Sequence, residues 1–264
     1  MNRAPDKRTA TLIAAIVSLS AFALPRDAVA REDCKAPELV CKAASNQDRS
    51  LYFRDHCRYQ QKIHIERFKV RTDGEQMEET RDTTVQVEPA RQPDKTGQTP
   101  VNVKVTADTD KKGNPRDNVK QDERTLLSFG AVWDLAFFPL LPEQLKYYSF
   151  QEVVSDRKGE RWFRFVPKPE VTSVPLAAGV AQLDELTGEV LTIKIESLHN
   201  LDSLDKEASK LRSFNATIDY NQYEGTLRMP SLASGSGVSG IRRFEGNFRF
   251  RFEEGRYLPL YKMD

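Results

Sequence analysis

The residues that could carry acid–base or nucleophilic chemistry do not form a catalytic set. Asp184 and Glu185 are neighbouring carboxylates, but adjacent side chains of a strand point to opposite faces, and a solvated turn explains the pair better. Ser234-Gly235-Ser236-Gly237 lacks the flanking pattern of a nucleophile elbow and indicates a flexible loop over residues 231–240. None of the three histidines is near a motif serine or cysteine, so a nucleophile would have no base. We therefore expect no catalytic residues and a protein that is not an enzyme.

The first thirty residues predict export. Three basic residues precede an apolar run from Thr11 to Leu24, and Ala28-Val29-Ala30 offers the small residues that a signal peptidase reads. The apolar run is about 14 residues long and ends at Pro25, short of the roughly 20 residues of a spanning helix. We therefore expect residues 1–30 to be a cleaved signal peptide, a periplasmic mature chain and no stable membrane span.

We expect residues 31–264 to form a single domain that binds no charged partner. The whole chain has 40 Lys and Arg against 39 Asp and Glu, and loss of four basic and two acidic residues with the signal leaves a net charge of −1. Nucleic-acid-binding proteins carry a clear basic excess or a basic stripe, and this chain has neither. We therefore expect no nucleic-acid partner, and a chain of this size can bury one core.

The cysteines predict a disulfide rather than a metal site. All three lie after the cleavage point, where an oxidising compartment preserves disulfides. A bond between Cys34 and Cys41 closes a loop of about eight residues, worth roughly 2.5 kcal/mol in the chain-entropy model. Cys57 then remains unpaired or bonds to another chain. His56 and His64 near Cys57 match no zinc spacing, so we expect no metal and no cofactor.

Most of the mature chain has the period-two alternation of amphipathic strands. A helix is expected over residues 43–57, with Ser45 or Asn46 as its cap, and Thr72-Asp73-Gly74 predicts a hairpin turn. The remaining alternating segments are residues 63–70, 75–88, 101–105, 147–154, 161–166, 179–184, 189–198, 214–220 and 244–252. Many of these strands are long, which favours a mainly β fold with one large curved antiparallel sheet over a sandwich.

The segment Leu126 to Pro142 is apolar at twelve of seventeen positions. A fully buried apolar side chain contributes roughly 1.5 to 3 kcal/mol, so some surface must cover these residues. Either they fill the concave face of the sheet permanently, or they share it with an apolar ligand. The candidate ligand-binding residues are Leu126, Leu127, Phe129, Val132, Trp133, Leu135, Phe137, Phe138 and Leu140.

Two local sequences carry a resemblance to a known family. Residues 179–190, GVAQLDELTGEV, form a strand, an Asp-containing turn and a second strand, and Gly255-Arg256-Tyr257-Leu258-Pro259 lies near the end of the chain. Together with the early helix, long hairpins and central apolar segment, they resemble the periplasmic outer-membrane lipoprotein carriers and their sorting-protein relatives, the LolA-like superfamily. The resemblance covers residues 45 to 262.

The resemblance implies an unclosed β-barrel covered by helices, with a half-barrel cavity for acyl chains. It implies a binding protein that carries a lipid, or the lipid moiety of a lipoprotein, towards the outer membrane, with an envelope protein as a further partner. The same fold would also suit an envelope-stress sensor. An outer-membrane β-barrel is a third alternative, but the strand Glu75 to Glu88 has charged residues on both faces, which a lipid-facing band does not allow.

Overall fold

The computed structural model describes residues 34–72, 74–89, 101–110, 112–115, 132–155, 157–204, 206, 208–240 and 245–260. The predicted signal peptide and the candidate residues Leu126, Leu127 and Phe129 lie outside the described residues. Among the described residues, no helix combines the length and apolar character needed to cross a membrane.

The described chain is dominated by one antiparallel sheet of ten strands, with the order β3-β2-β1-β12-β11-β8-β7-β6-β5-β4. Its strands are β1 (Cys57–Arg71), β2 (Gly74–Pro89), β3 (Val101–Asp110), β4 (Tyr148–Val153), β5 (Glu160–Pro167), β6 (Leu176–Asp184), β7 (Val190–His199), β8 (Leu211–Asp219), β11 (Leu232–Ser239) and β12 (Gly246–Pro259). Strands β9 (Gln222–Glu224) and β10 (Leu227–Met229) form a separate hairpin. The helical elements are α1 (Glu38–Asp55), a helical turn at residues 132–137, and the short 3-10 helices η2 (Leu145–Tyr147), η3 (Leu201–Ser203) and η4 (Ala208–Lys210).

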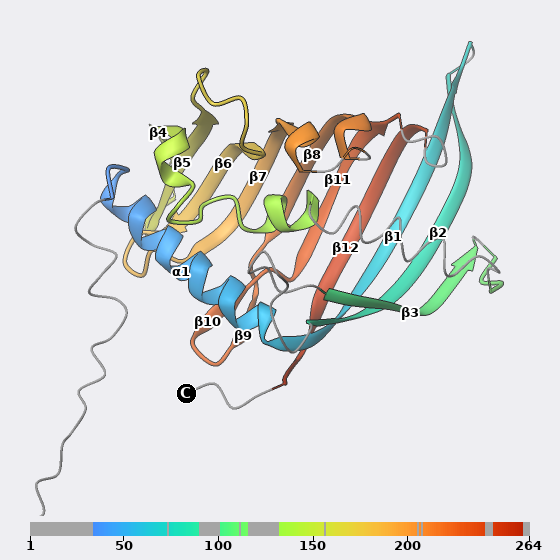
Figure 1. Ribbon diagram of the computed structural model, residues 1–264, viewed down its shortest axis with the longest axis horizontal. Coiled ribbons are helices and arrows are strands. Elements are labelled where there is room, and N and C mark those ends of the chain that lie inside the picture. The colour runs from blue at the N-terminus through green and yellow to red at the C-terminus, as the bar shows by residue number, and fades with distance from the viewer. Residues whose placement is uncertain are drawn as a thin grey trace, which may run out of the picture.

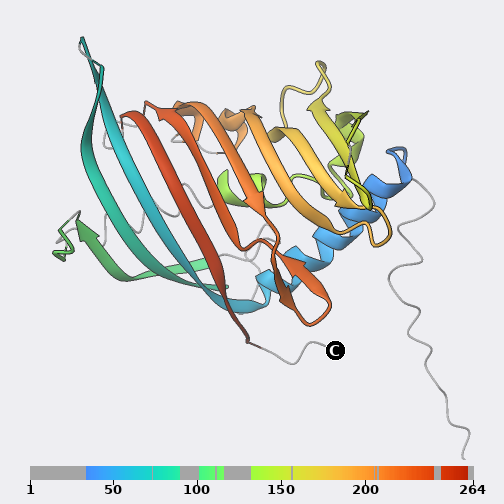
Figure 2. The same cartoon turned by 180° about the vertical axis from the view of Figure 1, so that it is seen from behind.

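The sheet is curved and open. Strands β3 and β4 form its two edges and do not pair with each other. Register shifts, at which one strand carries an extra residue, place that residue in β2, β3, β7, β8 and β12, and such bulges bend a sheet and increase its twist. Figure 1 shows α1 and a short helical turn on the same face of the bent sheet, and Figure 2 shows the strands of the opposite face. The predicted fold class, mainly β with an unclosed sheet covered by helices, is confirmed.

The strand order explains why an apolar segment lies over this sheet. Strands β3 and β4 follow each other in the sequence but lie at opposite edges. Residues 132–141, which belong to the connection between these two edge strands, lie against the inner face, and all of them except Asp134 are buried. The apolar composition of the segment matches this position, because a chain that lies on an apolar face must itself be apolar to remain there.

Helix α1 presents one stripe to the same face. Its buried residues follow the three- and four-residue spacing of a single helical face: Val40, Ala43, Ala44, Gln47, Ser50 and Arg54. The second half of this stripe, from Gln47 to Arg54, consists of polar residues, which is unusual for a helical face in contact with a core. The helix is also longer than predicted. It begins at Glu38 after Pro37, so the predicted caps Ser45 and Asn46 lie inside it and that expectation was wrong.

The predicted flexible loop at residues 231–240 is also wrong. Residues Leu232–Ser239 form β11, which pairs with both β8 and β12 in the middle of the sheet. Serine and glycine indicated a loop because they disfavour strands in isolation. The tertiary structure requires them here, because large side chains from the two neighbouring strands occupy the space above β11.

Candidate functional site

Four phenylalanines line the inner face of the central strands. Phe214 comes from β8, and Phe248, Phe250 and Phe252 come from alternate positions of β12, so all four point to one side of the sheet. Each is at most 4% exposed. We refer to these four residues as the aromatic floor.

Two glycines of β11 make the aromatic floor continuous. Gly235 is paired with Phe250 and Gly237 with Phe248. A Cβ atom at Gly235 would lie 2.0 Å from the backbone oxygen of Asn215 and 2.8 Å from Cζ of Phe250. Because neither glycine has a side chain, the rings of Phe214 and Phe250 meet across β11, with centroids 5.4 Å apart and an interplanar angle of 14°.

Residues 132–141, which we call the plug segment, lie on this floor. Residues 132–137 are helical. The Trp133 ring is 4.8 Å from the ring of Phe250 and 4.9 Å from that of Phe252, between centroids, and Phe137 is 5.1 Å from Phe252. The candidate residues that the structure describes belong to one hydrophobic cluster and are buried: Val132, Trp133, Leu135, Phe137, Phe138 and Leu140.

A buried arginine connects the plug segment to the helix and the sheet. Arg54, near the end of α1, is 2% exposed. Its Nε and Nη2 donate hydrogen bonds to the carboxylate of Glu254 at 2.7 and 2.9 Å, and its Nη1 donates to Oδ1 of Asp134 at 2.6 Å. Burial acts to lower the pKa of Arg54, but the attraction of Glu254, Tyr59 and Asp134 outweighs burial and leaves that pKa well above its usual value. Arg54 is therefore a permanent cation between two carboxylates.

Of the two carboxylates, Glu254 has all its hydrogen bonds within the protein. Besides Arg54, it accepts hydrogen bonds from Gln61 Nε2 at 2.8 Å and from the Tyr257 hydroxyl at 2.7 Å. A bulge in β12 makes this possible, because the pairing with β1 shifts between Arg58 and Gln60 and turns Tyr257 to the same side as Glu254. Burial, reinforced by the charge of Glu254, raises the pKa of Tyr257 well above its usual value, so its hydroxyl remains a donor.

A second polar contact holds the other end of the helical turn. The Gln47 amide, from the middle of α1, donates from Nε2 to the Phe137 carbonyl at 3.3 Å and accepts the Leu140 N–H on Oε1 at 3.0 Å. The Tyr220 hydroxyl donates to the same Phe137 carbonyl. Gln47 thus satisfies backbone groups on both sides of Pro139, where the helical turn has ended.

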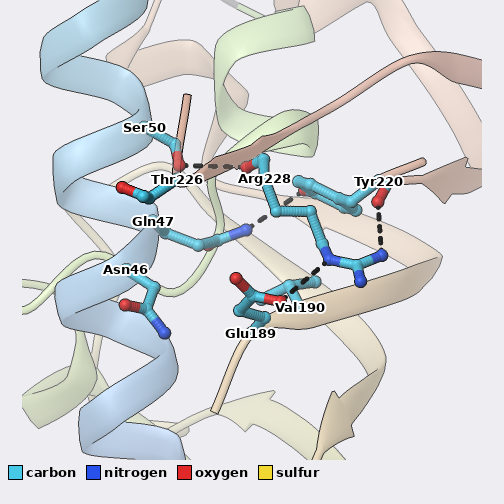
Figure 3. Close-up of a pocket in the computed structure, with 8 residues that line it drawn as sticks. All are labelled: Asn46, Gln47, Ser50, Glu189, Val190, Tyr220, Thr226 and Arg228. Carbon is cyan, nitrogen blue, oxygen red and sulfur yellow. Dashed lines mark hydrogen bonds and ion pairs between the residues drawn. The ribbon is translucent and has the colours of Figure 1, made fainter. Parts of the chain in front are cut away.

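A small polar pocket also borders Gln47 (Figure 3). It lies between α1, the start of β7 and the β9–β10 hairpin. Its lining residues are Asn46, Gln47, Ser50, Glu189, Val190, Tyr220, Thr226 and Arg228. Arg228 donates from Nε to Glu189 at 3.2 Å, and Ser50 donates to the Arg228 carbonyl at 3.0 Å. The cation of this pocket is therefore already paired, and the pocket is separate in character from the aromatic floor.

The other predicted site residues lie away from the aromatic floor. Cys34 and Cys41 form a disulfide, which ties the segment before α1 to the first turn of that helix. Cys57 is a buried free thiol. Asp184 accepts hydrogen bonds from the N–H groups of Leu186 and Thr187, as expected of a turn residue. Among the described residues, no group of three His, Cys, Asp or Glu side chains could hold a metal ion.

The sequence analysis missed Arg54, Gln47 and Glu254. A signal for the two helical residues exists, since Gln47 and Arg54 share the helical face of Val40 and Ala43 and are polar where that face is otherwise apolar. For Glu254 the signal is its place in the inward series of Phe248, Phe250 and Phe252. Their mutual contacts join residues about 200 positions apart and follow from the fold alone.

No protein-family model matches the chain, and no curated protein matches its sequence. Solved structures with a similar fold include a DUF1329 family protein from Desulfovibrio piger, 9% identical over 84% of this chain and 95% of the other, with a TM-score of 0.32. A LolA superfamily protein from Nitrosomonas europaea is 10% identical over 84% of this chain and 94% of the other, with a TM-score of 0.29. An outer membrane lipoprotein-sorting protein domain from Vibrio parahaemolyticus is 9% identical over 85% and 95%, with a TM-score of 0.31. The likeness of this chain to the LolA-like proteins is one of architecture alone.

Proposed function

We propose that this protein binds lipid acyl chains, or the lipid moiety of a lipoprotein, on the aromatic floor. It would act in the periplasm as a non-catalytic binding protein that carries its ligand towards the outer membrane. The observation that supports this proposal is the plug segment. An apolar cover rests on an apolar face, and among the described residues its hydrogen bonds to α1 come from two side chains, Arg54 and Gln47.

The energies favour a partial displacement of the plug segment. Exposing all its large apolar side chains would cost on the order of 10 to 20 kcal/mol, whereas exposing the four in its helical turn, Val132, Trp133, Leu135 and Phe137, would cost about 6 to 12 kcal/mol. Ten methylenes transferred from water to the aromatic floor return roughly 8 kcal/mol before association costs. A single acyl chain of about 10 to 15 methylenes, worth roughly 8 to 12 kcal/mol, can therefore offset displacement of the helical turn, residues 132–137, but not of the whole segment.

Such a movement needs one polar contact that opens and one that stays closed, and the plug segment has both. Asp134 lies in the turn that must leave, and its pair with Arg54 holds that turn down. Leu140 lies beyond Pro139, and its N–H remains bonded to Gln47 if only residues 132–137 move, whereas the hydrogen bonds from Gln47 and Tyr220 to the Phe137 carbonyl open with the turn. We propose that Arg54–Asp134 is the contact that opens and that Gln47 marks the fixed end.

Analysis of the protein from its native envelope tests the proposal. Organic extraction followed by mass spectrometry is expected to find bound lipid, and Trp133→Asp or Phe137→Asp is expected to release it, because a carboxylate on the turn that lies against the aromatic floor brings an unpaired charge next to the acyl chain. Trp162→Asp is the matched control. Trp162 lies on β5 directly before the inward residue Phe163, so it points to the other face of the sheet.

Two results would contradict the proposal. Lipid-free protein from repeated native preparations, with unchanged behaviour of both variants, would mean that the plug segment is permanent core. Loss of lipid in Trp162→Asp to the same extent as in Trp133→Asp would mean that general destabilisation releases it. If the native protein carries lipid, transfer of a labelled chain to vesicles separates a carrier, which releases its ligand, from a protein that retains it.

The proposed function includes export of the chain and removal of its signal peptide. A carrier of this kind requires export, and we propose cleavage after Ala30 with residues 31–264 as the mature domain. Amino-terminal sequencing of the native protein is expected to begin at Arg31. A native protein that begins at Met1 would contradict the predicted signal peptide.

A further inference from the structure

Trp133 and Asp134 together have the composition of an amphiphile. Trp133 is 7% exposed and rests on Phe250 and Phe252, whereas the Asp134 side chain is 54% exposed and reaches Arg54 at the edge of the buried region. An apolar body under cover and one carboxylate at the boundary with water are also the two parts of a fatty acid. The plug segment thus fills the site with an apolar group, Trp133, and a carboxylate, Asp134.

The hydrogen bonds of Arg54 determine which chemical group can take the place of the Asp134 carboxylate when the turn moves. Its Nε and Nη2 are already taken by Glu254, which itself has further partners in Gln61 and Tyr257 and so stays in place. If the helical turn moves away, Nη1 loses its carboxylate while the guanidinium remains buried. An unpaired donor on a buried cation is unfavourable, so the ligand that best stabilises the open state supplies an anionic oxygen at this position.

The anion position and the aromatic floor are adjacent. The Arg54 guanidinium carbon lies 6.0 Å from the ring centroid of Phe137 and 5.7 Å from that of Phe138. Phe137 in turn packs against Phe252 of the floor, with the two ring planes tilted by 60°. A chain that takes the place of Trp133 and Phe137 therefore begins within a few bonds of Nη1, so one molecule can occupy both positions.

We infer that the ligand is a lipid with an anionic group next to its acyl chain, and that this group replaces the Asp134 carboxylate on Nη1 of Arg54. This inference rests on the proposed function, because it assigns the head group of the ligand for the same site. A carboxylate and a phosphate monoester both supply the required oxygen. A neutral ester or alcohol does not supply it.

Binding to the unaltered protein compares three probes with the same acyl chain: palmitate, palmitic acid methyl ester and a palmitoyl lysophosphatidate. Titrations use monomeric lipid at about pH 8, where carboxylates are ionised. We expect the anionic probes to bind at least about tenfold more tightly than the methyl ester, in keeping with a hydrogen bond to a charged group. A gain with palmitate alone assigns a carboxylate, and a gain with lysophosphatidate alone assigns a phosphate.

The paired variant Arg54→Gln/Glu254→Gln locates the effect. It removes both charges together and leaves no buried carboxylate without a partner. We expect the preference for anions to disappear, and the methyl ester to bind at least as tightly as before, because the Arg54–Asp134 pair no longer holds the turn down. The matched control is Arg164→Gln/Glu196→Gln, which removes an exposed bidentate pair from the opposite face and is expected to keep the preference. Arg54→Lys, which retains the cation, is expected to keep part of it and serves if the paired variant does not fold.

The outcomes separate the inference from the proposed function. Equal affinity for all three probes would overturn the head-group inference and leave acyl-chain binding in place. An anion preference that survives in the paired variant would place the anion elsewhere and would also overturn it. No binding of any probe would overturn both.

Discussion

Arg54 and Asp134 form an ion pair of 2.6 Å between Nη1 and Oδ1 in which the guanidinium is buried and the carboxylate is half exposed. The pair links the end of α1 to the helical turn that covers the aromatic floor. Because one partner reaches water, the pair can open without moving Arg54 or its second partner, Glu254. This asymmetry makes Asp134, rather than Glu254, the contact that a ligand can replace.

Asp134→Asn should loosen the plug segment without unfolding the protein. The change removes one charge-assisted contact with a half-exposed partner, so we expect a loss of about 1 kcal/mol or less in the free energy of unfolding. In a Trp162→Phe background, Trp133 is the only tryptophan, and its emission should shift towards the red as the helical turn samples water. Asp48→Asn, on the exposed face of α1, is the control. Identical emission spectra for the two variants would show that Asp134 does not hold the turn.

The Arg54–Glu254 pair should show strong coupling. Removing either partner leaves a buried charge without its counter-ion, and we expect Arg54→Met or Glu254→Met alone to cost about 3 to 5 kcal/mol of stability. The double variant replaces the pair with apolar groups of similar size and should recover most of that loss. Urea unfolding of the four proteins gives the coupling energy. Additive losses in the double variant would contradict a direct buried pair.

Gly235→Val should damage the aromatic floor. Its Cβ would meet the Asn215 carbonyl at 2.0 Å and the Phe250 ring at 2.8 Å, so β11 or both neighbouring strands must shift. We expect a loss of about 1 to 3 kcal/mol, the usual cost of overpacking, measured by thermal or urea unfolding. Ser236→Val is the control, since Ser236 is the next residue of the strand and points to the other face. A tolerated valine at position 235 would mean that the rings do not need the glycine.

Cys57 should be unreactive in the native protein. Burial, and secondarily the charge of Glu224, raises the pKa of this thiol to about 11, and thiolate is the reactive form. At about pH 8 the folded protein should resist alkylation, and mass spectrometry should find one modified cysteine after denaturation and three after denaturation with reductant. Rapid modification of Cys57 without denaturant would show that the start of β1 is open to solvent.

The local pattern of apolar and polar residues in the sequence determined many of the strands of this protein and its buried central segment. The alternation of residues 161–166 and 189–198 defines β5 and β7 because a strand with one dry face needs that period, and the apolar composition around Trp133 marks a segment that must be covered. The same local rules were wrong for residues 231–240, because a glycine-rich strand is stable only when neighbouring rings fill the space above it. Only the tertiary structure could decide that. It also decided the meeting of Arg54, Asp134 and Glu254, since a contact between residues so far apart depends on strand order and on the bulge in β12, and neither leaves a periodic trace in the sequence.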